Sequence, residues 1–353
     1  MDNYKIIDKI IDRTVTIGGK SGDVKKQNNY FDFEAWEWPQ GVGMYGIYRA
    51  YKNSGEEKYK DVLISWYERR FSEILPDKNI NTTAPMYTLA YMYEDNLTER
   101  EKIEPILHEW ADWVMNVAPR TCCGGLEHSM RDKNGNIQGL DTTEQMWADT
   151  VFMTVMFLAK YAEIFDRDDC RREAKNQLLL HIKYLQDKET GLFYHGYHAR
   201  EEHNFGKIFW GRGNCWLTIA LSDYLELIGQ SDEDYEYLKG VLCAQADSLM
   251  KYQTKNGMWR TVIMNEASYE ETSATAGFTY GVVKGIKSGL LDKRYQAMAD
   301  SAINALFDNA DENGTVHNVS AGTVVGWDDE AYIKIPIQER IYGQSMVLLA
   351  LAV

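Results

Sequence analysis

The chain has 353 residues, of which 44% are hydrophobic and 12% aromatic, enough apolar side chains for a large core. It has 6 prolines and no Ser/Gly-rich or low-complexity stretch that could serve as a linker, so we expect residues 1–353 to form a single domain. The formal net charge of -15 argues against nucleic acid and membrane surfaces as partners. An anionic ligand would therefore need cationic side chains close to it, where salt screens their attraction least.

The N-terminal residues and the cysteines bear on the cellular compartment. Residues 1–14 alternate charged residues with isoleucines and contain no apolar run of signal-peptide length, and no later segment reads as a membrane span. The 5 cysteines show no metal-type spacing, and their odd number does not suit a full disulfide framework. We therefore expect a reduced, cytoplasmic protein; the sequence does not indicate its oligomeric state.

The first candidate for a ligand contact is Trp38, in the aromatic segment of residues 36–41. A tryptophan face packs well against the apolar face of a sugar ring, which would place Trp38 at the rim of a binding funnel. Core packing explains the same residue equally well.

A turn glycine followed by a short extended stretch occurs four times, at Gly125, Gly191, Gly257 and Gly314. The first three glycines are 66 residues apart and the last interval is 57 residues. Pairs of amphipathic stretches lie between them, for example residues 144–165 with 171–186 and residues 215–228 with 234–253. Each period is therefore predicted to be a helical hairpin closed by a glycine turn and a short strand.

A period near 60 residues divides the chain into about six hairpins. Six hairpins can close on themselves, so the sequence predicts an all-α fold, an (α/α)6 barrel with an inner and an outer ring of helices and short strands in the connecting loops. An open α-solenoid is the alternative, but the repeats carry aromatic and polar residues rather than a uniform stacking interface.

Asp149 is the candidate acid. Asp141 and Glu144 resemble a capping pair, and the helical spacing that follows places Asp149 about two turns into a helix over residues 144–165. Its neighbours on that helix, Met153 among them, are apolar, so we expect burial to raise the pKa of Asp149 and to keep a proton on it. A structural aspartate that accepts backbone or tryptophan N–H bonds is the alternative interpretation.

Arg212 is the candidate anion contact. In residues 211–214 (GRGN), the glycines free the backbone, and Asn214 is a plausible N-cap for a helix over residues 215–227. A guanidinium beside unpaired helix N–H groups suits a carboxylate or a phosphate. Trp210 and Trp216 flank the arginine and could stack on sugar rings, although tryptophans so placed are often core residues.

Four segments taken together resemble the family 105 glycoside hydrolases, the unsaturated rhamnogalacturonyl hydrolases. They are residues 146–153 (MWADTVFM), 194–196 (YHG), 209–216 (FWGRGNCW) and 271–278 (ETSATAGF), in this order. The likeness extends over most of the chain and implies the same six-hairpin barrel. The related glucuronyl hydrolases of family 88 carry a His-Asp pair on an early inner helix, whereas residues 81–85 here (NTTAP) have no carboxylate, which favours family 105.

The resemblance also implies site residues. The family's acid/base aspartate falls on Asp149, two positions after an aromatic residue that matches Trp147, and its substrate-contacting histidine falls on His195. Its Trp-x-Arg-x-x-x-Trp set falls on Trp210, Arg212 and Trp216, with Arg212 expected to hold a uronate carboxylate. The alternative for His195 is a hydrogen-bonded structural histidine.

A single acid indicates a particular reaction, because ordinary glycosidases need two carboxylic residues. In the family's chemistry, one acid hydrates the enol ether of the 4,5-unsaturated uronic acid that a polysaccharide lyase leaves at the non-reducing end. We expect no cofactor and no metal, since His195, His198 and His203 lack the spacing of a zinc site. The alternatives are an unsaturated glucuronyl hydrolase acting on ulvan or glycosaminoglycan fragments, an α/α-barrel sugar epimerase, and a noncatalytic oligosaccharide-binding protein.

Overall fold

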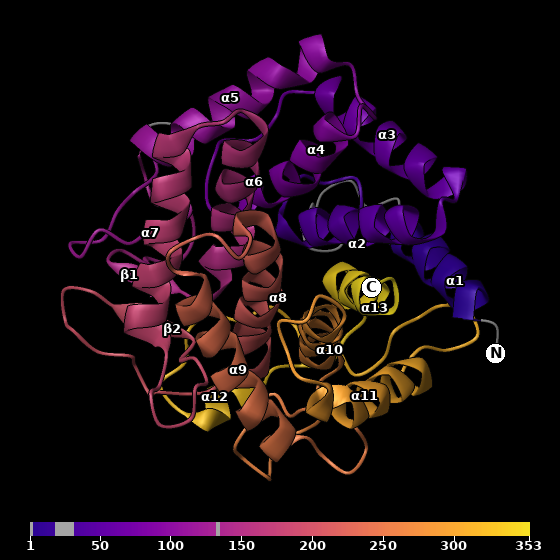
Figure 1. Ribbon diagram of the computed structural model, residues 1–353, viewed down its shortest axis with the longest axis vertical. Coiled ribbons are helices and arrows are strands. Elements are labelled where there is room, and N and C mark those ends of the chain that lie inside the picture. The colour runs from indigo at the N-terminus through magenta and orange to yellow at the C-terminus, as the bar shows by residue number, and fades with distance from the viewer. Residues whose placement is uncertain (1–2, 18–31, 132–134) are drawn as a thin grey trace.

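The computed structural model describes residues 3–17, 32–131 and 135–353. Six helices form an inner ring, in which each contacts the next (Figure 1). They are α2 (Trp38–Ser54), α4 (Ala84–Glu94), α6 (Met156–Ile164), α8 (Gly211–Ile228), α10 (Thr272–Lys287) and α13 (Ile341–Leu351). Because α13 packs against α2, the ring is closed, which confirms the (α/α)6 barrel and excludes the open solenoid.

The outer ring covers the inner one with helices of opposite direction. Its members are α1 (Asn3–Thr16), α3 (Glu57–Phe71), α5 (Arg100–Asn116), α7 (Asp168–Leu185), α9 (Tyr235–Tyr252) and α11 (Gln296–Asp308). Each of α3 to α11 packs on the inner helix that precedes it, and α1 packs on α13. Helices from the two ends of the described chain thus form the sixth pair.

The connecting segments carry the short elements. These are the strands β1 (Gln145–Trp147) and β2 (Gly196–His198), the helix α12 (Asp329–Ile333), a π-helical turn before α6 (Val151–Val155), and single 3-10 turns at Asn81–Thr83 and Lys293–Tyr295. The two strands pair antiparallel, with Trp147 opposite Gly196. Short strands in the loops were expected from the repeat.

Three of the four repeat glycines adopt a left-handed backbone: φ is 75° at Gly191, 79° at Gly257 and 81° at Gly314. A Cβ atom at each of them would collide with the backbone of an outer helix, α9, α11 and α1 in turn. Glycine is therefore required twice over, for its backbone angle and for close packing. Gly125 differs, because the left-handed residue there is its neighbour Gly124, with φ of 87°.

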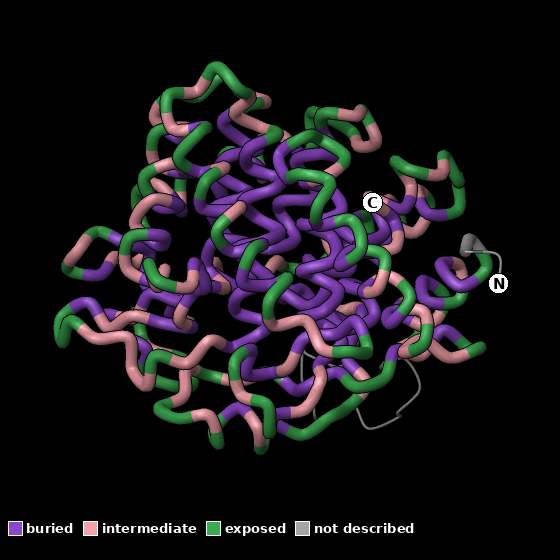
Figure 2. Tube along the Cα trace, turned by 60° about the horizontal axis from the view of Figure 1, so that its bottom comes forward, coloured by how far each residue is buried: buried purple, intermediate pink, exposed green. Residues whose placement is uncertain are grey.

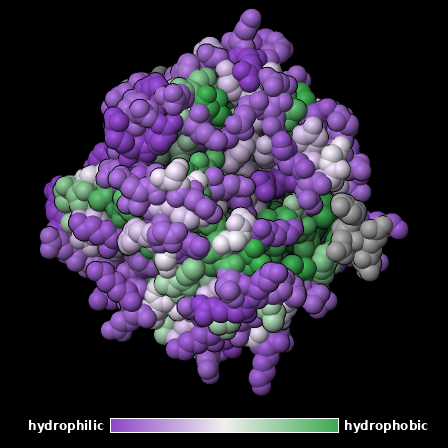
Figure 3. All heavy atoms as spheres, viewed as in Figure 1, coloured by the Kyte–Doolittle hydropathy of each residue, from purple (hydrophilic) through white to green (hydrophobic). Residues whose placement is uncertain are grey.

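Burial separates the two rings of helices (Figure 2). In α10, every residue from Thr272 to Gly285 is buried, and in α13 every residue from Ile341 to Ala350. A helix that is buried all round must be covered on all sides, which the outer ring achieves. The outer helices turn their polar faces to solvent, and Figure 3 shows this hydrophilic surface with a band of apolar side chains across its middle.

The helix predicted over residues 144–165 begins later than expected. Residues 145–147 form β1, and helical structure starts at Asp149. Glu144 does not cap a helix, because it has a φ of 63° and its carboxylate accepts the backbone N–H of Cys122. Strand pairing with β2 therefore overrides the local helical pattern, and Asp149 is the first helical residue instead of lying two turns inside the helix.

Two further findings concern the described residues as a whole. None of their helices has both the length and the apolar character that a membrane span requires. All five cysteines are free thiols.

Candidate active site

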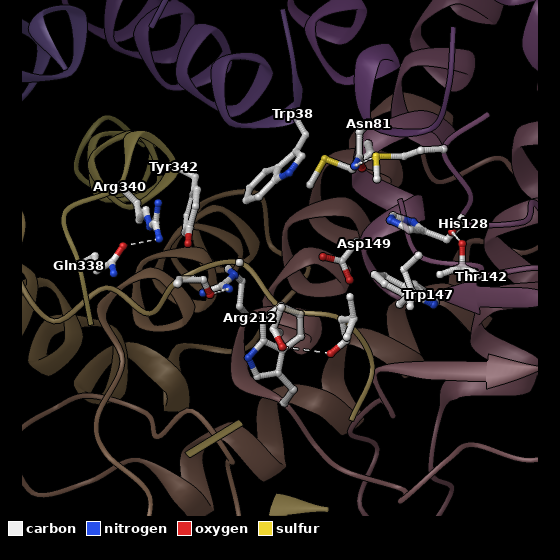
Figure 4. Close-up of a pocket in the computed structure, with 18 residues that line it drawn as sticks. Trp38, Asn81, His128, Thr142, Trp147, Asp149, Arg212, Gln338, Arg340 and Tyr342 are labelled. Carbon is white, nitrogen blue, oxygen red and sulfur yellow. Dashed lines mark hydrogen bonds between the residues drawn. The ribbon is translucent and has the colours of Figure 1, made fainter. Parts of the chain in front are cut away.

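The inner helices all begin at the same end of the barrel, where a cavity of about 760 Å³ opens (Figure 4). Side chains at or near the N-termini of α2, α4, α6, α8 and α13 line it, together with the loop before α13. The lining residues are Trp38, Asn81, His128, Met130, Leu140, Thr142, Trp147, Asp149, Met153, Trp210, Arg212, Ala321, Gly322, Thr323, Val324, Gln338, Arg340 and Tyr342.

This arrangement makes the cavity attractive to anions although the chain carries a net charge of -15. The N-terminus of a helix bears a partial positive charge and unpaired N–H groups, and several such ends converge here. The guanidinium groups of Arg212 and Arg340 lie on the same side of the cavity (Figure 4). Asp149 is the only carboxylate among the described residues that line it.

Strand pairing places Asp149 beside His195. The backbone N–H of Ala148 donates to the carbonyl of His195 at 2.9 Å, continuing the β1–β2 pairing by one residue. Nε2 of His195 then lies 3.3 Å from Oδ2 of Asp149. Neither of these two atoms has a hydrogen bond of good geometry within the described protein. The other carboxylate oxygen, Oδ1, accepts the indole N–H of Trp216 at 3.0 Å.

The protonation of Asp149 differs from the sequence prediction. Burial does raise the pKa of Asp149, as expected, but the contact with His195 and the nearby His128 and Arg212 lower it more, and the net pKa lies below the usual value. The prediction of a raised pKa was wrong because the sequence could not show that the carboxylate faces two histidines and an arginine. In the free protein, Asp149 is therefore ionised at neutral pH.

Both histidines near Asp149 are buried and uncharged at neutral pH. Burial lowers the pKa of His128 to about 4 and also lowers that of His195, in spite of the neighbouring carboxylate. Nδ1 of His128 contacts the hydroxyl of Thr150 at 2.9 Å, and its ring stacks on Trp147 with 4.3 Å between ring centroids. Two neutral imidazoles thus offer N–H donors and N acceptors, but no charge.

Arg212 is 1% exposed and is held by the protein as well as facing the cavity. Its guanidinium donates to the hydroxyls of Ser273 and Ser320 and to the carbonyl of Ala321, at 3.2, 2.7 and 2.8 Å. An oxygen of the buried Glu271 lies 3.7 Å away. This carboxylate offsets part of the arginine's charge and fixes its orientation.

The predicted cap of this helix needs correction. Helix α8 begins at Gly211, after the N-cap Trp210, so Asn214 lies within the first turn. The side chain of Asn214 pairs instead with the backbone N–H and C=O of Phe193, at 2.7 Å each. It thereby ties the start of α8 to the segment that carries His195.

The four candidate tryptophans occupy two kinds of position. Trp38, Trp147 and Trp210 line the cavity. Trp216 is fully buried, stacks on Phe152 with 5.1 Å between ring centroids, and reaches the site through its N–H bond to Asp149. The sequence suggested the same role for Trp210 and Trp216, which flank the arginine, whereas the structure gives them different surroundings.

Sequence reasoning missed several residues of the cavity. Asn81 was noted only for its missing charge, and it faces the cavity at the start of α4, close to Asp149 (Figure 4). His128 stands in the first repeat segment, as His195 does in the second, so the repeat itself was a usable signal. Arg340 and Tyr342 start α13, and the rule that inner helices begin at the cavity would have found them.

Metal binding finds no support in the described parts of the chain, which contain no cluster of three or more His, Cys, Asp or Glu residues suited to a metal ion. His195 is turned towards Asp149. His198 and His203 lie elsewhere, with 5.6 Å between their ring centroids.

Comparisons with known proteins agree with the fold and the motifs. The sequence matches Glycosyl Hydrolase Family 88 over residues 7–352. It is 30% identical to the unsaturated rhamnogalacturonyl hydrolase YesR of Bacillus subtilis (strain 168), over 98% of this chain and 93% of YesR. An unsaturated 3S-rhamnoglycuronyl hydrolase of Formosa agariphila is 25% identical over 79% of this chain and 75% of its own length.

Among solved structures, a possible member of the GH105 family from Klebsiella pneumoniae superposes with a TM-score of 0.93 and 36% sequence identity, covering 99% of this chain and 92% of that one. The chain is therefore a glycoside hydrolase of family 105, the unsaturated rhamnogalacturonyl hydrolases, within the broader Glycosyl Hydrolase Family 88.

Proposed function

We propose that this enzyme releases a 4,5-unsaturated uronic acid from the non-reducing end of lyase-generated oligosaccharides, with unsaturated rhamnogalacturonan fragments as its substrates. One observation carries the proposal: Asp149 is the single carboxylate on the described cavity wall. The relationship to YesR supports the choice of rhamnogalacturonan. Membership of a hydrolase family sets aside the sugar epimerase and the noncatalytic binder.

A single carboxylate cannot carry out ordinary glycoside hydrolysis. Retaining and inverting glycosidases need two carboxylic groups on either side of the bond, one as the acid and one as the nucleophile or base. The buried Glu271 cannot serve as the second, because it lies behind Arg212, accepts hydrogen bonds from Ser273 and Ser320, and is absent from the cavity wall. An enol ether removes the need, since one acid can activate it.

The proposed reaction begins at the double bond. Asp149 gives its proton to C4, and the ring oxygen stabilises the positive charge that develops at C5. The Asp149 carboxylate then takes a proton from a water molecule, whose oxygen bonds to C5. The resulting hemiketal opens to a C5 ketone, which leaves a hemiacetal at C1, and this collapses to an aldehyde and frees the aglycone hydroxyl.

The lowered pKa of Asp149 adds a requirement to these reaction steps. Asp149 is ionised in the free protein, so it must take up a proton before or during substrate binding. A bound uronate brings a negative charge and displaces water from the carboxylate, and both changes favour the protonated form. The enzyme therefore binds its substrate together with a proton.

Two arginines support an anionic substrate. Arg212 is fixed by Ser273, Ser320 and Glu271, which makes it a rigid, preorganised donor for the uronate carboxylate. Arg340 lies on the same cavity wall and extends this positive region. Trp38, Trp147 and Trp210 provide flat apolar faces for the sugar rings.

The test uses a panel of unsaturated disaccharides made by lyases from rhamnogalacturonan, ulvan and a glycosaminoglycan, and follows the ultraviolet absorbance of the enol ether. We expect the rhamnogalacturonan product to be cleaved with the highest kcat/KM. A higher value for the ulvan product would make the enzyme a hydrolase of ulvan fragments. A higher value for the glycosaminoglycan product would make it an unsaturated glucuronyl hydrolase.

The mechanism is tested with the hydrogenated disaccharide and with heavy-oxygen water. The hydrogenated analogue should survive, because it has no C4 that can be protonated. The heavy oxygen should appear in the C5 carbonyl of the product. Cleavage of the saturated analogue at a comparable rate, or label at C1, would show a conventional glycosidase and overturn the proposal.

A further inference from the structure

Tyr332 lies behind His195 and outside the cavity wall. It comes from α12, in the loop that leads to α13, and its side chain is fully buried. Its hydroxyl lies 2.8 Å from Nδ1 of His195. It also accepts the backbone N–H of Gly326 at 2.8 Å. A chain of contacts thus runs from Gly326 through Tyr332 and His195 to Asp149.

The hydrogen bonds determine where the protons of this chain lie. Because Gly326 donates to the Tyr332 oxygen, the remaining Tyr332 hydrogen needs an acceptor of its own. Among the described residues, Nδ1 of His195 is the only acceptor in hydrogen-bond contact with it. Leaving this hydrogen without a partner in a fully buried position would be costly, so Nδ1 must be unprotonated.

A neutral imidazole without a proton on Nδ1 carries it on Nε2. The pKa of His195 is lowered by burial, so the ring is neutral at neutral pH. Nε2 is the atom that lies 3.3 Å from Oδ2 of Asp149. We propose that Tyr332 is a positioning residue that holds His195 in the Nε2–H tautomer, so that the ring atom nearest to the Asp149 carboxylate carries the proton. The tautomer follows from the structure alone, whereas its role in turnover rests on the proposed function.

The packing around His195 supports a fixed ring. Trp210 lies against the imidazole with 4.2 Å between ring centroids, and Trp147 packs against it in an edge-to-face arrangement with 5.3 Å between ring centroids. The backbone N–H of His195 donates to Ile208, and its carbonyl accepts from Ala148. With the ring and the backbone held, the tautomer is the remaining variable, and Tyr332 controls it.

The fixed N–H has a function in the proposed reaction. It stabilises Asp149 as a carboxylate when water is to be activated, and it orients the carboxyl group when the proton is to be given up. The other tautomer would present a lone pair to the carboxylate and repel it.

The test is Tyr332→Phe, which removes the hydroxyl and keeps the ring. Histidine labelled with nitrogen-15 reports the tautomer by NMR without substrate, and His195→Gln identifies the His195 signals among those of the 7 histidines. In the wild-type enzyme we expect a proton on Nε2 and none on Nδ1. In Tyr332→Phe, the signals should shift towards a mixture of the two tautomers.

The matched control is Tyr269→Phe. The Tyr269 hydroxyl donates to the carbonyls of Tyr332 and Ile335, both at 3.3 Å. This change therefore loosens the same α12 segment but keeps the contact between the Tyr332 hydroxyl and His195. It should leave the His195 signals and kcat unchanged. Tyr332→Phe should lower kcat by roughly threefold to tenfold, the value of one hydrogen bond, with little change in KM.

Each outcome decides the proposal. A wild-type enzyme with a proton on Nδ1 would overturn it, even if Tyr332→Phe does not fold, and so would a variant whose tautomer is unchanged. An equal effect of Tyr269→Phe would show that α12 packing, and not the hydroxyl, is responsible. If the tautomer behaves as expected but no unsaturated oligosaccharide is cleaved, the proposed function fails and the tautomer assignment stands.

Discussion

Two aspartates of the barrel, one partly and one fully buried, have opposite surroundings. Asp149 lies at the cavity, and one of its oxygens has no hydrogen bond of good geometry from the described protein. Asp223 lies inside the barrel, near the other end of α8, and is fully buried. Its two oxygens accept hydrogen bonds from Tyr45, Tyr87, Tyr280 and Lys284, at 2.7, 3.2, 2.8 and 2.6 Å.

The difference shows how the same side chain serves two purposes. Asp223 joins helices α2, α4, α8 and α10 through partners that satisfy both of its oxygens, so it has no capacity left for a ligand. Asp149 has a side chain that is 17% exposed and one oxygen still available. Incomplete satisfaction at a cavity is a property of functional groups, and complete satisfaction is a property of structural ones.

The largest expected effect comes from Asp149→Asn. An amide keeps the shape and can still accept the Trp216 N–H bond, but it cannot give a proton to C4. We expect kcat to fall by roughly a hundredfold to ten-thousandfold, with an unchanged thermal unfolding temperature. A variant that retains more than about a tenth of the wild-type rate would make Asp149 structural, like Asp223.

Asp223→Asn should have the reverse profile. It leaves the buried ammonium of Lys284 without one of its two carboxylate partners, the other being Glu226. Breaking a buried pair in this way costs about 3–5 kcal/mol, so denaturant unfolding should show a clear loss of stability. The folded variant should keep its kcat, and a loss of turnover at unchanged stability would contradict the assignment of the two roles.

Arg212→Lys tests whether the cavity binds a carboxylate through a planar fork. Lysine keeps the charge but loses the paired donors, so kcat/KM for unsaturated uronates should fall by roughly 1.5–3 kcal/mol in free-energy terms. Arg294→Lys, an exposed arginine paired with Asp247 far from the cavity, is the control. An unchanged kcat/KM in Arg212→Lys would leave carboxylate binding to Arg340.

The smallest effect is a shift in the pH profile of Trp216→Phe. The protonated form of Asp149 is the active acid, so kcat/KM should fall as the pH rises through its lowered pKa. Removing the Trp216 N–H destabilises the carboxylate, which raises this pKa and moves the falling limb to higher pH by about one unit. Asp149 also faces His195, His128 and Arg212. Because the pKa of His128 is about 4, its titration could also change the rate at low pH, and the pH profile of His128→Gln identifies that contribution. A limb that stays in place in Trp216→Phe would exclude Asp149 as its origin.

The sequence was sufficient for the architecture and for five residues of the cavity wall. Glycines at a regular interval reveal the hairpins because three of the four, Gly191, Gly257 and Gly314, must pack closely against an outer helix. Trp38, Trp147, Asp149, Trp210 and Arg212 do line one cavity. Their roles towards a substrate remain proposals.

What the sequence could not supply depends on contacts between distant segments. The pKa of Asp149 was predicted with the wrong sign because His195 reaches it only through the pairing of β1 with β2. Tyr332 comes from α12, far from His195 in the sequence, and nothing in its local sequence marks it. Helical periodicity across residues 144–150 was misleading because a short strand can share the pattern of a helix end.

The packing of α1 on α13 has a consequence for how activity is acquired. During synthesis, α1 lacks the inner helix on which it mainly packs until α13 has been made, and α13 begins only at Ile341. Arg340 and Tyr342 arrive with α13. A nascent barrel with five hairpins therefore has an unfinished cavity, and we expect turnover only after α13 has closed the ring.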